Sequence, residues 1–121
     1  MLGAAHAAAN PLTARYGLVH GHAVALTLPV VLRWNLEDPA AAEIYRELGE
    51  CIGEALPEWL ERTIKMARLP DLGGFEIGED EIGAMAREAA AQWTGQFNPR
   101  PMEEKDFASL YRSLLGVKAD S

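Results

Sequence analysis

Helical periodicity runs through almost the whole of this 121-residue sequence and constrains its fold more than any other feature. Helix-favouring residues dominate, and no stretch alternates apolar and polar residues with the β-branched side chains typical of a strand. Proline and glycine divide the pattern into segments. The sequence therefore predicts an all-α fold, a helical bundle of about six helices, over residues 2–15, 20–34, 37–56, 57–68, 82–93 and 103–115.

Two of these segments carry clear local signals. In the third, Asp38 suits the N-cap and Pro39 the first helical position, and an apolar face recurs at helical spacing. That face consists of Ile44, Leu48 and Ile52. In the last segment, an apolar face formed by Phe107, Leu110, Tyr111 and Leu114 is expected to point inward. The tryptophans are expected to pack in the core rather than to bind a ligand; they are Trp34, Trp59 and Trp93.

Composition narrows the class of protein. Hydrophobic residues make up 49% of the chain, but 20 of them are alanine, so the core is expected to be thin. The net charge of −7 argues against binding nucleic acid or an anionic membrane surface. The longest apolar run, residues 23–32, is far shorter than the roughly 20 residues of a membrane span. With a single cysteine, Cys51, the sequence predicts a cytoplasmic protein.

All three histidines, His6, His20 and His22, lie in one short window. On a straight helix, His6 and His20 would be about 21 Å apart, whereas imidazole nitrogens that share a metal each lie about 2.1 Å from it. A shared site therefore requires the chain to turn back between them, and Pro11 and Gly17 are the candidate helix breakers.

His22 and Asn10 lie in the same window and differ in whether they share the helical face of a neighbouring histidine. His22 is rotated by about 200° from His20 and is a poor third ligand. Asn10, one turn after His6, shares its face. The spacing leaves two interpretations open: a two-histidine metal half-site with Asn10 beside it, or three unrelated histidines.

Two long motifs give a resemblance to a known family. The stretch "GAAHAAANPLTARYGLVHGHAVALTLPVVLRWN" resembles the metal-binding segment of the iron-containing (group III) alcohol dehydrogenases, with His6, His20-Gly21, Leu28-Pro29 and Arg33-Trp34-Asn35 in register. The stretch "AAAQWTGQFNPRPMEEKDFASLYRSLL" is similar to the closing segment of that family. The resemblance implies the helical C-terminal part of the dehydroquinate synthase-like alcohol dehydrogenase fold.

The resemblance also implies a ligand set. His6 and His20 match two of the histidine ligands of the catalytic metal, Fe(II) or sometimes Zn(II), and the remaining ligands lie upstream in the family. Residues 1–121 would then be a single helical domain, truncated, without the nucleotide-binding domain and the first metal-ligand helix. Asn10 stands where many members carry a histidine close to the nicotinamide, and asparagine can hydrogen-bond there but cannot titrate.

The chemistry that the resemblance implies is hydride transfer between a small-molecule alcohol and NAD(P), giving an aldehyde or ketone, or the reverse. This chain alone is expected to be inactive. An alternative from another class is a stand-alone helical interaction or structural module with relic histidines. An uncovered apolar patch around Val24, Leu26, Leu28 and Val31 is expected to associate with the missing domain or with further copies of the chain.

The segment Asn98-Pro99-Arg100-Pro101 has a structural interpretation. Its prolines fix an extended turn ahead of the last helix, and Asn98 is able to close a turn through its side chain. Arg100 is expected to reach an acidic partner rather than to act in catalysis.

Overall fold

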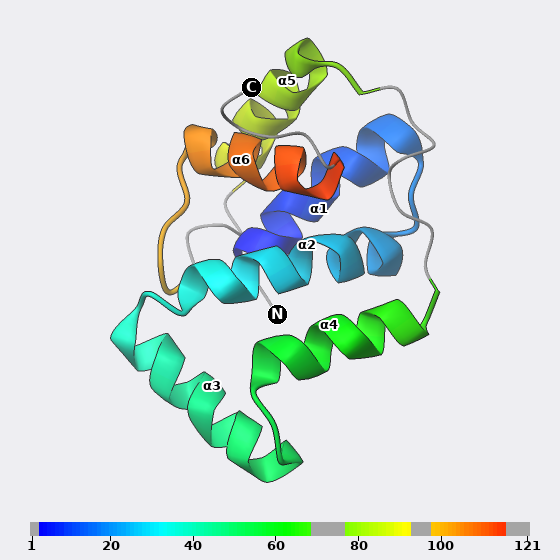
Figure 1. Cartoon of the computed structure of the whole chain (residues 1–121). Coiled ribbons are helices and arrows are strands. Elements are labelled where there is room, and N and C mark those ends of the chain that lie inside the picture. Colours follow the sequence, from blue (N-terminus) through cyan, green and yellow to red (C-terminus); the bar gives the residue numbers. More distant parts are fainter. Residues whose placement is uncertain (1–2, 69–76, 93–97, 116–121) are drawn as a thin grey trace.

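The computed structural model describes residues 3–68, 77–92 and 98–115. These residues form helices and connecting turns without a strand, so the predicted all-α fold is confirmed (Figure 1). The helices are α1 (Ala4–Tyr16), α2 (His20–Asn35), α3 (Pro39–Ile52), α4 (Leu56–Met66), α5 (Glu79–Ala90) and α6 (Glu104–Leu115). None of them is long and apolar enough to cross a lipid bilayer.

The core lies where α1 packs against α2 and α5, and where α5 packs against α6. Helix α1 contributes mainly alanines to it, and such small side chains let neighbouring helices approach closely. Larger buried side chains come from α5 and α6, and they include Ile82, Met85, Phe107, Leu110 and Tyr111. The predicted inward face of the last helix is thereby confirmed, with Leu114 packed against its edge.

Pro11 is one of the two candidate helix breakers, but it does not break the first helix, which the sequence predicts over residues 2–15. Helix α1 continues through it to Tyr16, and the Pro11 ring is buried. The chain turns instead at Gly17, whose φ of 69° lies in the left-handed region that a residue without Cβ adopts readily. Burial of the proline ring against the core offsets the backbone hydrogen bond that the proline cannot donate.

Helix α3 starts as the sequence predicts and ends earlier. The Asp38 carboxylate accepts a hydrogen bond from the Ala41 N–H at 3.0 Å, and Pro39 occupies the first turn. Gly53, with a φ of 83°, ends the helix before residue 56. The stripe of Ile44, Leu48 and Ile52 stays 40–55% exposed, because α3 lies at the periphery beside α4 and away from α5 and α6 (Figure 1).

Two helix-interior glycines provide a matched test of this packing. A Cβ added to the buried Gly49 would lie 2.8 Å from the Glu54 carbonyl oxygen, so Gly49→Ala is expected to lower the free energy of unfolding by about 1–3 kcal/mol. At Gly83 the atom nearest to an added Cβ would be the Arg87 guanidinium at 3.8 Å, so Gly83→Ala is expected to raise the free energy of unfolding by up to about 1 kcal/mol. Denaturant titration of both variants measures the difference, and a shift of the same sign in both would contradict the close approach of the Glu54 carbonyl to Gly49.

Candidate metal centre

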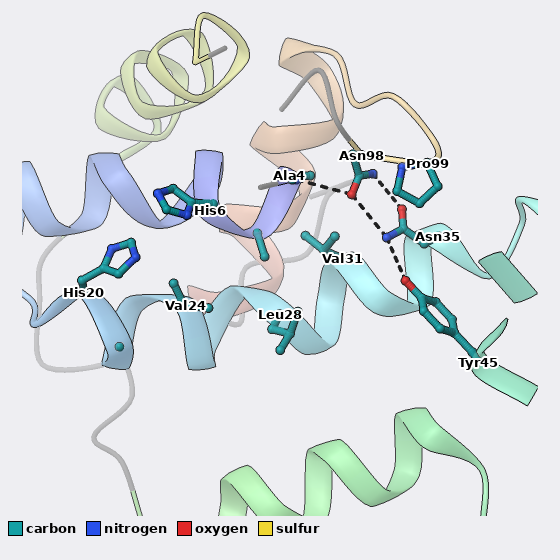
Figure 2. Close-up of a pocket in the computed structure, with 13 residues that line it drawn as sticks. Ala4, His6, His20, Val24, Leu28, Val31, Asn35, Tyr45, Asn98 and Pro99 are labelled. Carbon is teal, nitrogen blue, oxygen red and sulfur yellow. Dashed lines mark hydrogen bonds between the residues drawn. The ribbon is translucent and has the colours of Figure 1, made fainter. Parts of the chain in front are cut away.

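The His6 and His20 rings meet in the gap between α1 and α2. His6 lies in the first turns of α1, and His20 is the first residue of α2. The chain reverses at Gly17, and the His6 ring from α1 and the His20 ring from α2 lie next to each other across the space between the two helices (Figure 2). Their centroids are 4.8 Å apart, and the ring planes are inclined by 58°. The expected convergence of these two rings is therefore present.

The two rings stand at one end of a trough of about 580 Å³ between α1 and α2. Its apolar wall is formed by Val24, Leu28 and Val31, which follow one face of α2 (Figure 2). His22, two positions after His20, does not line the trough. Such an arrangement, an apolar channel with coordinating side chains at its end, suits a small and partly apolar molecule.

The predicted apolar patch on α2 is only partly exposed. Val24 and Leu28 are half-buried and face the trough, and Leu26 packs against the core. Val31 is only 3% exposed, so its assignment to an uncovered patch is wrong. The reason is that Val31 joins the core cluster with the N-terminal alanines of α1.

A buried amide pair closes the other end of the trough. The Asn98 side-chain Nδ2 donates to Asn35 Oδ1 at 2.7 Å, and Asn35 Nδ2 donates to Asn98 Oδ1 at 3.3 Å. Asn35 Nδ2 also donates to the Tyr45 hydroxyl at 3.1 Å (Figure 2). The sequence places Asn35 only in the matched motif and does not single out Tyr45, because no local pattern marks contacts between residues that lie 10 and 63 positions apart.

Asn10 lies one turn after His6 on α1 but is not part of the trough wall. Its Nδ2 donates a hydrogen bond to the Gln92 side-chain oxygen at 3.0 Å, which links α1 to the residues after α5. The Asn10 amide is therefore oriented by Gln92. It can hydrogen-bond a ligand but cannot take up or release a proton near neutral pH.

The donor set at the His6–His20 end consists of two imidazoles. Imidazole nitrogens suit Fe(II) and Zn(II), and a ring separation of 4.8 Å leaves room for both to reach one ion. Across the described residues 3–68, 77–92 and 98–115, no group of three histidine, cysteine, aspartate or glutamate side chains is placed to hold a metal. The pair therefore has the character of a half-site.

The turn before α6 is held by reciprocal contacts with the end of α2. The Trp34 indole N–H donates to the Arg100 carbonyl at 2.9 Å, and the Arg100 guanidinium lies 3.4 Å over the Trp34 ring. Arg100 also pairs with Glu37 at 2.7 Å, the acidic partner expected from the sequence. Trp34 is thus half-buried and holds Arg100 in place, and it is not the core residue that was predicted. Trp59 is half-buried as well, and Trp93 lies outside the described residues.

Comparison with known proteins gives a consistent set of similarities. Residues 1–115 match the model of the Fe-containing alcohol dehydrogenase family, C-terminal. The chain is 32% identical to 1-propanol dehydrogenase PduQ of Salmonella typhimurium, over 94% of this chain and 35% of that protein. It is 30% identical to lactaldehyde reductase of Escherichia coli, over 93% of this chain and 32% of that protein.

A solved structure shares the fold. The iron-containing alcohol dehydrogenase from Thermococcus thioreducens superposes with a TM-score of 0.82 at 22% identity, over 96% of this chain and 32% of that one. The chain thus spans about a third of the length of the relatives that it matches.

Proposed function

The chain belongs to the Fe-containing alcohol dehydrogenase family, and we propose that it is the metal-binding C-terminal part of an NAD(P)-dependent alcohol dehydrogenase. The observation that carries the proposal is the approach of the His6 and His20 rings to 4.8 Å at the end of an apolar trough. Such a pair at a cavity wall has the chemistry of a metal half-site, and the family match over residues 1–115 points to the reaction.

In this proposal His6 and His20 hold a divalent metal, Fe(II) or Zn(II). When bound, that ion acts as a Lewis acid that polarises the oxygen of an alcohol or aldehyde. Val24 and Leu28 keep water away from the alkyl part of the substrate along the trough. Asn10, the residue proposed to lie near the nicotinamide, contributes hydrogen bonding but no proton.

The rest of the enzyme is proposed to come from additional chain. The relatives are about three times as long as this chain, and we assign the NAD(P)-binding domain and the remaining metal ligands to that additional length. Cofactor positioning contributes several kcal/mol to catalysis, so residues 1–121 by themselves are expected to be inactive. A cytoplasmic location is part of the same proposal and is supported by the single cysteine.

Metal titration of the chain tests the proposal. The metal-free protein is expected to bind one Zn(II) or Co(II) per chain, measured by equilibrium dialysis. Both His6→Ala and His20→Ala are expected to weaken that binding by about tenfold or more, since even the loss of groups around metal ligands costs about 10–100-fold in affinity. His22→Ala is the matched control and is expected to keep the wild-type affinity. Absence of stoichiometric binding would favour the stand-alone module with relic histidines. An equal loss in His22→Ala would contradict the assignment of His6 and His20 as the ligand pair.

A further inference from the structure

The first turn of α1 is capped from a distant part of the sequence. The residue before the helix is Gly3, which has no side chain to accept a hydrogen bond from the first N–H groups. The Ala4 N–H instead donates to the Asn98 side-chain Oδ1 at 3.3 Å, across 94 positions of the sequence. Ala4 lies just two positions before His6. The cap and the proposed ligand therefore share one helical turn (Figure 2).

The Asn98 amide has no orientational freedom left. Its Oδ1 accepts from both the Ala4 N–H and Asn35 Nδ2, and its Nδ2 donates to both Asn35 Oδ1 and the Arg100 carbonyl. An amide side chain has two donor hydrogens and two acceptor lone pairs, so all four positions are satisfied. Asn98 is only 7% exposed, and a buried network satisfied in this way is rigid.

Helix α1 depends on hydrogen bonds to fix its position because the side chains on its packing surface are short. Its buried residues before Pro11 are all alanines, which form only shallow ridges to set the register of one helix on another. A shift of one residue would move His6 by about 1.5 Å along the axis and rotate it by about 100°. Hydrogen bonds to the α1 backbone fix the register instead. The Ala4 N–H donates to Asn98 Oδ1, the Thr27 hydroxyl donates to the Ala5 carbonyl at 3.0 Å, and the Tyr111 hydroxyl donates to the Ala8 carbonyl at 2.6 Å.

We propose that Asn98 is a positioning residue for His6. By holding the Ala4 N–H, it sets the rotation and register of the first turn of α1, and it thereby brings the His6 ring to His20. The functional meaning of this role rests on the proposed metal half-site. The geometric role does not, because it concerns the two rings in the metal-free chain.

The experiment uses two readouts on the 121-residue chain. NMR of the metal-free protein measures contacts between the His6 and His20 ring protons, and Zn(II) titration measures affinity. Asn98→Ala is expected to abolish the ring contact and to weaken Zn(II) binding by about 10–100-fold. Asn98→Asp keeps an oxygen for the Ala4 N–H but loses the amide donors. Asn98→Asp is expected to keep the ring contact, since a carboxylate also suits a helix N-terminus, and to bind Zn(II) with an affinity within about threefold of wild type. Its melting temperature is expected to be lower than that of the wild type.

Gly49→Ala is the control for general destabilisation, since it disturbs the α3–α4 turn away from α1. It is expected to lower the melting temperature while keeping the ring contact. The inference is overturned if folded Asn98→Ala keeps the contact, if Gly49→Ala loses it equally, or if the wild-type chain lacks it. Should Asn98→Ala not fold, a folded Asn98→Asp decides: loss of the ring contact overturns the inference, and its retention supports it. A wild-type chain that shows the contact but binds no Zn(II) would refute the half-site and leave the positioning role standing.

Discussion

Fusion of this chain to the upstream part of 1-propanol dehydrogenase PduQ is expected to yield an enzyme that oxidises 1-propanol with NAD(P)+, whereas residues 1–121 alone give no turnover. The fusion supplies what the chain is proposed to lack, a cofactor domain and the remaining metal ligands. His6→Ala and His20→Ala in the fusion are expected to lower kcat/KM by at least about 100-fold. A coordinated metal contributes several kcal/mol to transition-state stabilisation, and about 1.36 kcal/mol corresponds to a tenfold change in rate.

His22→Ala provides the control for this experiment, because His22 does not line the trough and activity should persist without it. Asn10→His is expected to be tolerated, since Asn10 lies on the face of α1 one turn after His6. Turnover by the isolated 121-residue chain would overturn the proposal that the cofactor domain and the remaining metal ligands come from additional chain. Full activity of the His6→Ala fusion would show that His6 is not a ligand of the metal.

Phe107→Ala is expected to have the largest effect on stability. The Phe107 side chain of α6 is 1% exposed and belongs to the core between α1, α5 and α6. Its truncation leaves a cavity and is expected to cost about 3–5 kcal/mol of unfolding free energy. Because domains of this size are stable by only about 5–15 kcal/mol, a large part of the total would be lost. Urea titration followed by circular dichroism measures this change.

Ile44→Ala is the comparison variant, because it also removes a large apolar side chain from a helix. Ile44 is 55% exposed on α3, so little additional apolar surface would be returned to water and the expected cost is below about 1 kcal/mol. Equal losses in the two variants would mean that α3 packs more deeply than the structure describes. A loss confined to Phe107→Ala would place the stabilising core at α1, α5 and α6.

Local signals in the sequence determined the helices themselves. Asp38 and Pro39 start α3 as predicted, because a cap hydrogen bond and a fixed proline φ act within one turn of the chain. The family was also predictable, because its two long motifs are continuous in the sequence. The spacing left open whether His6 and His20 meet, and the family resemblance predicted that they do; Gly17 rather than Pro11 makes the turn between them.

Only the tertiary structure decided which apolar faces are covered and which polar groups meet. Phe107 and Ile44 belong to equally regular apolar stripes, yet one is buried and the other exposed. Trp34 holds Arg100 instead of filling the core, and Asn98 caps α1 across 94 positions. Periodicity and caps report interactions within one or two helical turns. Burial of a face and satisfaction of a buried amide depend instead on the helix that packs against them, and that helix comes from a distant part of the chain.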